Sequence, residues 1–292
     1  MDEIDNKDSL EHYYDANTRR FLKFGQGGDT YSIHRAVWGP GVKTRRHAFQ
    51  YVNQLLLEQA DSAGADVILD LGCGVGGSIR YLADRISSRL YGVTISAVQA
   101  GIGKKVLQDA GINDRCSVFH GDFLEPEFYR NAGIYNDTVN LAYAVESFNH
   151  CSEPEKFFNR MESVITKGGA LAICDDFLKS EMDVLGKRER RLVENYRKGW
   201  HIHTLITLED MDSLAERNGF RRVDELDLSP FLELDRLRDR LIRIILIAVR
   251  LFPGRILSPG RAWLSDLKGG NALQLCLKRR IIGYYFTLYV HG

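Results

Sequence analysis

A glycine-rich turn directly after an apolar run constrains the fold of this chain more than any other feature. Residues 67–71 read Val-Ile-Leu-Asp-Leu, and a glycine-rich run follows in which Gly72, Gly74 and Gly77 have the spacing G-x-G-x-x-G. An amphipathic segment at residues 79–86 begins directly after the turn. This order predicts a strand, a tight turn and a helix, which is the entry unit of an open α/β sheet. Because glycine has no Cβ, a ligand can approach the backbone N–H groups at the helix N-terminus, so the turn is a candidate binding site.

The spacing of the glycines does not by itself identify a ligand. A dinucleotide site needs an acidic residue about 20 residues after the glycines to bind the ribose hydroxyls. Residues 90–96 read Leu-Tyr-Gly-Val-Thr-Ile-Ser and contain no carboxylate. Asp70 instead precedes the glycines, where a negative charge suits a cationic amine better than a pyrophosphate. A tight strand–helix turn without any ligand is the alternative interpretation.

The composition excludes several classes of protein. The chain has 292 residues with 39 basic and 39 acidic side chains, so its net charge gives no argument for binding nucleic acid. Its five cysteines form no C-x-x-C pair, which indicates reduced thiols and no disulfide framework or zinc site. No signal peptide opens the sequence, and the longest apolar run, residues 244–249, is too short to span a bilayer. We therefore expect a cytoplasmic protein that acts on a small molecule and has no transmembrane segment; peripheral membrane contact and a homo-oligomeric state stay open.

Two motifs resemble those of known methyltransferases. The run D-L-G-C-G-V-G-G at residues 70–77 resembles the first motif of the class I S-adenosylmethionine (AdoMet)-dependent methyltransferases with a Rossmann-like fold. The run G-V-T-I-S-A-V-Q at residues 92–99 resembles a motif of the tocopherol, sterol and cyclopropane-fatty-acid methyltransferases, in which Thr and Gln replace the usual ribose carboxylate. Asp122 follows the expected third strand, where the family binds the adenine amino group. The resemblance implies that AdoMet is bound by Asp70, Gly72, Gly74, Gly76, Thr94, Gln99, Asp122 and Phe123.

The candidate acid–base residues follow the fourth expected strand, residues 137–144. Glu146 and His150 lie in the run E-S-F-N-H, at the carboxyl end of a strand, where ligands bind in parallel sheets. The run resembles the tocopherol and sterol group, and in relatives that methylate a prenyl alkene a Glu in this neighbourhood is the proposed base. The alternative is that Glu146 only accepts hydrogen bonds from backbone N–H groups. Tyr14 belongs to a Tyr-Tyr-Asp run that resembles the family segment folded over the cofactor, although ordinary helix packing explains it equally well.

Aromatic and histidine residues outside these motifs are candidates for a substrate wall. They are His34, Trp38, Tyr196, Trp200, His201 and His203. Packing of Trp38 on the core is an alternative. Residues 201–203 alternate as a strand would, which would put two histidines on one face, but no third ligand follows at a suitable spacing, so we expect no metal site.

The chain is expected to form one sheet domain with helical additions. Residues 1–60 would be an N-terminal helical cap, and residues 61–292 the AdoMet-binding domain with lid insertions at about 178–205 and 231–280. The resemblance implies a seven-stranded, mostly parallel sheet with helices on both faces and an antiparallel last strand. Within residues 234–252, arginines share one helix face and apolar side chains the other. A lid with a solvated basic face is the simplest interpretation; a helix on a membrane surface or one that binds a diphosphate are the others.

The motifs together predict methyl transfer from AdoMet to a carbon atom of a small lipophilic or isoprenoid acceptor. Glu146 or His150 would remove a proton, and an aromatic ring of Tyr14, Trp200 or Trp38 would stabilise a carbocation. Mg²⁺ would be needed only if the acceptor carries a diphosphate. N- or O-methylation of a small polar metabolite is the second reading, and a non-catalytic AdoMet-binding protein is a distant third.

Overall fold

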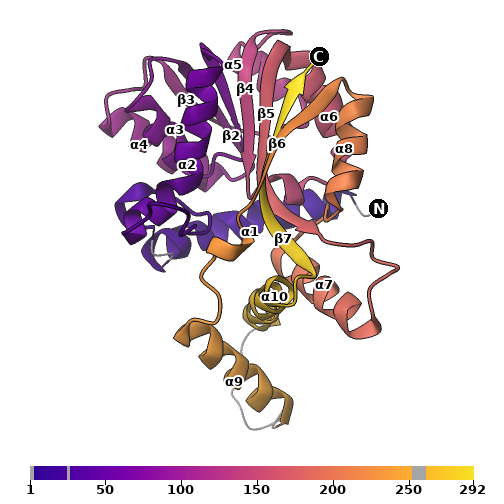
Figure 1. Cartoon of the computed structure of the whole chain (residues 1–292). Helices are drawn as coiled ribbons and strands as arrows, with labels where there is room; N and C mark the ends of the chain where they lie inside the picture. The colour runs from indigo at the N-terminus through magenta and orange to yellow at the C-terminus, as the bar shows by residue number, and fades with distance from the viewer. Residues whose placement is uncertain (1–2, 25–26, 252–260) are drawn as a thin grey trace.

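The structure is a computed structural model that describes residues 3–24, 27–251 and 261–292. Its centre is a seven-stranded sheet with the strand order β3-β2-β1-β4-β5-β7-β6 (Figure 1). The strands are β1 (Val67–Leu71), β2 (Arg89–Thr94), β3 (Cys116–His120), β4 (Val139–Val145), β5 (Ile165–Leu178), β6 (Phe220–Asp227) and β7 (Ile282–His291). Strand β7 is antiparallel to both of its neighbours, and the other neighbouring pairs are parallel. The predicted sheet, including its antiparallel last strand, is confirmed.

Helices cover both faces of the sheet, as Figure 1 shows. One face carries α2 (Arg45–Ser62), α3 (Gly77–Ala83) and α4 (Ala97–Asp109). The other carries α5 (Pro126–Ala132), α6 (Pro154–Val164) and α8 (Leu208–Arg217). The two layers form because side chains alternate along each strand, so a buried central strand must be apolar on both sides.

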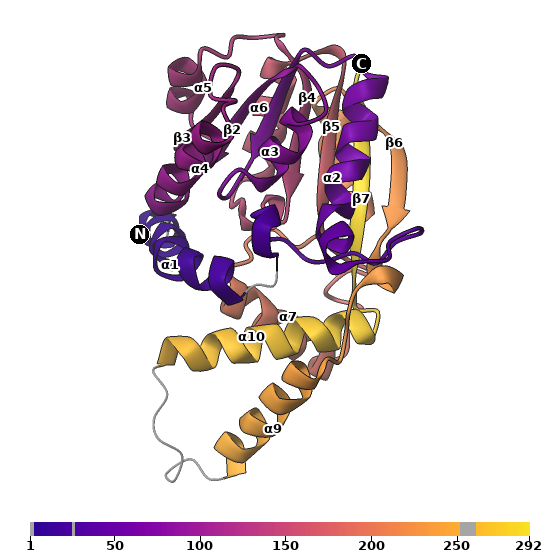
Figure 2. The ribbon, with the colours of Figure 1, turned by 90° about the vertical axis from the view of Figure 1, so that its left-hand side faces the viewer.

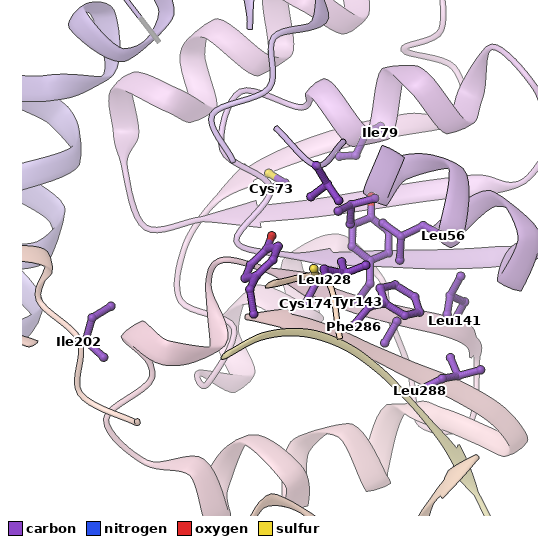
Figure 3. Packing of buried hydrophobic residues seen from close by; sticks show 14 of the residues in the cluster. Leu56, Cys73, Ile79, Leu141, Tyr143, Cys174, Ile202, Leu228, Phe286 and Leu288 are labelled. Carbon is purple, nitrogen blue, oxygen red and sulfur yellow. The ribbon is translucent and has the colours of Figure 1, made fainter. Parts of the chain in front are cut away.

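Strand β4 illustrates how the two cores are separated. Leu141 and Tyr143 belong to the core under α2, whereas Ala142 and Ala144 belong to the core under α6. Figure 3 shows Tyr143 among Leu56 of α2 and side chains of β7. The phenol of Tyr143 is fully buried, and its hydroxyl is satisfied by Asp70 on the neighbouring strand. The sheet core thus reaches directly to the turn that follows β1.

The remaining helices lie at the carboxyl ends of the parallel strands (Figures 1 and 2). They are α1 (Glu3–Phe24), α7 (Lys187–Trp200), α9 (Leu237–Leu251) and α10 (Arg261–Lys278). Helix α10 lies so close to α7 that a Cβ added to Gly269 would lie 2.7 Å from Gly199 Cα. The two expected lid insertions therefore lie on the side of the sheet where ligands bind.

The N-terminal 60 residues do not form a single unit over the site. Helix α1 and the loop after it lie across the carboxyl ends of the strands, but α2 packs on the sheet face (Figure 2). Val52 and Leu56 of α2 are fully buried in the same core as Tyr143. Thr44 begins α2 by accepting a hydrogen bond from the His47 backbone N–H at 3.2 Å. The N-terminal segment that lies over the site therefore ends before Thr44.

Helix α9 differs from the simplest expectation, a lid with a solvated basic face and a buried apolar face. Its apolar side chains face solvent: Leu237 is 78% exposed and Ile244 61%. On the basic face, Arg243 is not fully solvated: it is half-buried and pairs with Asp235, with 2.8 Å between Nη2 and Oδ1. None of the helices in the described part of the chain has the length and apolar character needed to cross a bilayer.

Candidate active site

A large cavity lies at the carboxyl ends of the strands. Its volume is about 1010 Å³, at the upper limit of the roughly 300–1,000 Å³ usual for one small ligand. The sheet side of its wall is polar and includes Asp70, Thr94 and Glu146. Helices α1, α2, α7, α9 and α10 contribute both polar side chains, such as Arg20, Arg238 and Gln274, and the apolar side chains of Leu10, Phe49, Trp200, Ile242, Leu273 and Leu277. The cavity therefore has room for two small molecules, one on each side.

The glycine turn lies against this cavity in a conformation that requires glycine. Gly72 has φ +90°, and a Cβ there would lie 2.4 Å from Ser147 Cβ. Gly74 has φ +55°, and both residues line the cavity. Gly76 does not, which corrects its expected place: with φ +79° it precedes α3, and its carbonyl accepts the Arg80 N–H at 3.0 Å. Its positive φ shapes the turn, but Gly76 itself does not line the cavity.

Asp70 is a buried carboxyl group on the cavity wall. Its Oδ2 accepts a hydrogen bond of 2.9 Å from the Tyr143 hydroxyl. Burial raises the pKa of Asp70 to about 7, although the Tyr143 hydrogen bond favours the ionised form. A cation bound in the cavity would lower that pKa again and keep Asp70 ionised. Asp70 is therefore suited to a positively charged ligand.

The other residues expected to bind the cofactor also line this part of the cavity. The hydroxyl of Thr94 donates to Gln99 Oε1 at 2.6 Å, which joins the end of β2 to the first turn of α4. Asp122 and Phe123 follow β3 and line the cavity as well, and Asp122 Oδ1 accepts the Leu124 N–H at 2.9 Å. The ends of three neighbouring strands thus bring these polar groups together.

Glu146 follows β4 in a strained backbone conformation, with φ +51°. Its Oε1 accepts hydrogen bonds from the Arg35 backbone N–H (2.8 Å), from Arg35 Nε (3.2 Å) and from the Tyr284 hydroxyl (2.9 Å). Burial alone would raise the pKa of Glu146, but the charge of Arg35 and these hydrogen bonds hold that pKa below its usual value. Glu146 is therefore an ionised carboxylate on the cavity wall. It also accepts a hydrogen bond from a backbone N–H, that of Arg35, so this part of the alternative interpretation holds as well.

Arg35 is the site residue that the sequence analysis missed. Its guanidinium binds Asp176 through two parallel hydrogen bonds, Nη1 to Oδ1 and Nη2 to Oδ2, both 2.8 Å. It also lies over the Tyr284 ring, 4.3 Å from the centroid. One cation thus bonds two carboxylates, that of Glu146, which lines the cavity, and that of Asp176, which is fully buried. The only signal in the sequence was a single arginine within an otherwise uncharged loop, residues 31–42.

Asp175 also lines the cavity, and unlike Glu146 it favours the protonated form. Burial raises the pKa of Asp175 to about 8, and the neighbouring charge of Asp176 acts in the same direction. Its Oδ2 accepts the Asn149 N–H at 3.0 Å. Neither aspartate is solvated, since Asp175 is 2% and Asp176 0% exposed. At neutral pH Asp175 is mostly a neutral carboxylic acid.

Tyr14 and His150 form a hydrogen-bonded pair on the cavity wall. The Tyr14 hydroxyl lies 2.8 Å from His150 Nε2, and His150 Nδ1 lies 3.0 Å from the His201 carbonyl oxygen. Because a carbonyl only accepts, Nδ1 carries the proton and Nε2 accepts from the tyrosine. Burial lowers the pKa of His150 to about 4, so its imidazole is neutral.

Asp15 holds this pair in place by attaching α1 to α4. Its Oδ1 accepts from the Ser96 hydroxyl at 2.5 Å and from the Val98 N–H at 3.2 Å. Ser96 itself begins α4 by accepting the Gln99 N–H at 3.1 Å. The Tyr-Tyr-Asp run therefore supplies two cavity residues, Tyr13 and Tyr14, and one anchor, Asp15.

Four of the six expected substrate-wall residues line the cavity: His34, Tyr196, Trp200 and His203. Trp38 and His201 do not. The Trp38 backbone N–H donates to the Phe231 carbonyl at 2.8 Å, which turns this residue toward the segment before α9. His201 ends α7 with φ +52°, so the strand expected at residues 201–203 does not form.

Two buried nitrogen atoms on the cavity wall have no hydrogen-bond partner among the described residues, His34 Nε2 and Trp200 Nε1. His34 Nδ1 donates to the Arg35 carbonyl at 3.1 Å, which leaves Nε2 as an acceptor. Trp200 Nε1 is a donor. A ligand with a hydroxyl group could satisfy either atom. No group of three metal-ligating side chains occurs in the ranges that the structure describes.

Comparison with known proteins agrees with this geometry. Residues 2–197 match the family model described as mycolic acid cyclopropane synthetase. The chain belongs to the mycolic acid cyclopropane synthetase family. The relationship expected from the glycine turn and from residues 92–99 is thereby confirmed.

Two relatives with similar sequences are named for lipophilic substrates. A probable tocopherol O-methyltransferase of rice is 27% identical over 56% of this chain and 44% of its own length. The 24-methylenesterol C-methyltransferase 3 of Arabidopsis thaliana is 25% identical over 86% of this chain and 71% of its own length. The chain thus matches less than half of the first relative.

Solved structures confirm the fold. A cyclopropane synthase from Mycobacterium tuberculosis superposes with a TM-score of 0.72 at 15% identity, covering 99% of this chain and 98% of that one. Geranyl diphosphate C-methyltransferase from Streptomyces coelicolor, solved with Mg²⁺, geranyl diphosphate and S-adenosylhomocysteine, superposes with a TM-score of 0.65 at 14% identity and covers 98% of both chains.

Proposed function

We propose that this protein is an AdoMet-dependent methyltransferase that methylates a carbon atom of a lipophilic, isoprenoid-type acceptor, with Glu146 as the base. The proposal rests chiefly on one observation, an ionised carboxylate on the wall of a largely apolar cavity beside the glycine turn. Membership of the family and the names of the relatives support it.

The cavity residues fit AdoMet. Asp70, with its raised pKa, offers a carboxylate for a positively charged group, and the positive φ of Gly72 and Gly74 leaves the backbone without side chains against the cavity. Thr94 and Gln99 bond to each other and can exchange that bond for ribose hydroxyls. Asp122 and Phe123 would hold the adenine. When bound, AdoMet supplies an electrophilic methyl group.

The protein side of the reaction consists of positioning, exclusion of water and one proton transfer. Methylation of an alkene carbon leaves a positive charge on the acceptor, which the Glu146 carboxylate on the cavity wall would stabilise. Glu146 then takes a proton from the neighbouring carbon, and the electron pair of that C–H bond restores a double bond. A carboxylate with a lowered pKa serves here, because a carbocation is a very strong acid. The Tyr14 ring, which stays neutral because burial raises the pKa of its hydroxyl, adds cation–π stabilisation.

The apolar wall determines the class of acceptor in this proposal. Leu10, Phe49 and Leu273 give a long hydrocarbon its contacts, while His34 and Trp200 give a hydroxyl group its partners. If the acceptor carries a diphosphate, the diphosphate itself would have to hold Mg²⁺, because the described residues provide no metal-binding cluster.

A labelled-methyl transfer assay tests the proposal. The protein is incubated with labelled AdoMet and with sterols, phenolic isoprenoids, prenyl diphosphates or small amines, each with and without Mg²⁺. We expect label on carbon in a product that extracts into organic solvent, and its loss in Glu146→Gln while AdoMet binding persists. Label found only on nitrogen or oxygen would contradict C-methylation and would favour the polar-metabolite reading.

A further inference from the structure

Helix α9 presents a stripe of large aliphatic side chains to solvent. Leu237 is 78% exposed, Leu241 60%, Ile244 61% and Ile247 54%. The first three recur at intervals of four and three residues, which places them on one side of the helix. Single exposed aliphatic residues are ordinary, but a continuous stripe on one helix marks an interaction surface.

The opposite side of α9 is attached to the protein, so the exposed stripe is not the side that packs on the protein. Asp239 is 8% exposed and accepts the Arg236 N–H at 3.0 Å, which fixes the start of the helix. Asp239 and Ile242 on this side line the cavity, and Arg238, at the edge between the two sides, also reaches it. Figures 1 and 2 show α9 projecting from the molecule beyond α10, and no other helix or strand of the described residues covers its outer side. One side of the helix thus borders the cavity while the other faces outward.

The charge of α9 indicates what could cover the stripe. Residues 237–251 contain four arginines and one aspartate. Arg238 and Arg240 are exposed and flank the stripe on its two edges. In a two-fold dimer through this surface, the same arginines of both copies would meet and repel each other. An anionic surface with an apolar interior instead matches both the stripe and its cationic edges.

We propose that α9 docks in the plane of an anionic lipid bilayer, with Leu237, Leu241 and Ile244 among the acyl chains and Arg238 and Arg240 at the headgroups. Docking would bring the side of the cavity that α9 lines to the membrane, where a lipophilic acceptor is dissolved. This inference concerns lipid binding and does not depend on the methyl-transfer chemistry.

Co-sedimentation of the full chain with vesicles tests it. We expect binding to phosphatidylglycerol vesicles that weakens with salt, and far weaker binding to phosphatidylcholine vesicles. The double variant Leu241→Gln/Ile244→Gln should lower the partition coefficient about tenfold or more, and Arg240→Gln about fivefold. Tyr135→Gln is the matched control, because Tyr135 is 73% exposed in the loop before β4, at the opposite end of the sheet.

AdoMet affinity of each variant, measured in the same preparations, shows whether the protein remains folded. Absence of vesicle binding by the wild-type chain, or binding that the double variant leaves unchanged, would overturn the proposal. So would a dimer in sedimentation velocity that the double variant dissociates without any effect of lipid, because the stripe would then belong to a second copy.

Discussion

Arg35 and Glu146 are 111 residues apart in the sequence, yet two groups of Arg35 donate to the same oxygen of Glu146. The backbone N–H lies 2.8 Å and Nε 3.2 Å from Oε1. The loop that follows α1 therefore fixes the orientation and the charge of the carboxylate at the end of β4. Asp176 fixes Arg35 in turn, so the base we propose depends on three separate segments of the chain.

Replacing Glu146 tests its role as the base. Glu146→Gln keeps the shape of the side chain but removes the negative charge and the ability to accept a proton. We expect kcat to fall about 10²- to 10⁴-fold, as is typical for loss of a general base. AdoMet affinity by isothermal titration calorimetry should change little. Tyr284→Phe, which removes one hydrogen bond to Oε1, should cost far less, and an unaltered kcat in Glu146→Gln would remove Glu146 from the chemistry.

Replacing Arg35 should change both stability and the pH profile. Arg35→Met leaves Asp176, which is fully buried, without its charged partner and with only the Tyr196 hydroxyl, among the described residues, donating to its side chain, and breaking a buried pair in this way costs about 3–5 kcal/mol of the free energy of unfolding. Glu146 loses the charge that lowers its pKa, while burial continues to raise it, so the acid limb of kcat/KM should move to higher pH. Arg45→Met is the control: its pair with Glu233 is partly exposed and should contribute about 0–1 kcal/mol. An acid limb at the same pH in both variants would contradict this account.

The sequence predicted the sheet well because local patterns determine it. Apolar strands, the glycine turn and Ser96 as a helix start are all readable from neighbouring residues. Arg35 was not predictable in this way, since its partners lie 111 and 141 residues away. His34 and Trp38 come from the same loop and looked alike, but only tertiary contacts decide that His34 meets the cavity and Trp38 the segment before α9.

The same limit applies to α9. Its amphipathic pattern correctly predicted a helix, but a pattern does not say whether the apolar side finds a partner within the chain. The exposed stripe therefore came from the structure.

The pKa of Asp70 predicts how AdoMet affinity depends on pH. The free protein has a pKa of about 7 at this carboxyl, and a bound cation lowers it. Below pH 7 binding must therefore expel a proton, so affinity should fall as the pH decreases from 7 to 5.5 and should level off above 7. Titration calorimetry across this range measures the effect. Asp70→Asn should bind more weakly with a flatter profile, whereas Asp109→Asn, on the exposed end of α4, should behave as wild type.

The anchor at Asp15 predicts a local effect of its removal. Asp15→Ala takes away the acceptor of the Ser96 hydroxyl and the Val98 N–H, and a lost helix cap of this kind costs about 1 kcal/mol. We expect faster amide hydrogen exchange in α1 and a higher KM for AdoMet, with the sheet unaffected. Asp29→Ala, which removes an exposed pair with Arg46, should leave exchange in α1 unchanged. Equal exchange in both variants would show that α1 is held by other contacts.

The glycine turn predicts a large effect of one added methyl group. Gly72→Ala places a Cβ 2.4 Å from Ser147 Cβ at φ +90°, a region that costs an L-residue about 1–2 kcal/mol before any overlap. We expect lower stability in urea and weaker AdoMet binding. Gly101→Ala is the matched control, because that glycine lies in α4 with no atom within 4 Å of the added Cβ, and should gain about 0.5–1 kcal/mol.

The double variant Gly72→Ala/Ser147→Gly separates the two causes of this effect. Removing the Ser147 side chain relieves the overlap but leaves the positive φ, so urea unfolding should show partial recovery relative to Gly72→Ala. AdoMet affinity should recover less than stability, because a Cβ at position 72 still projects from a backbone that lines the cavity. Complete recovery of both would show that the overlap with Ser147 is the whole effect and that close ligand approach does not require glycine here.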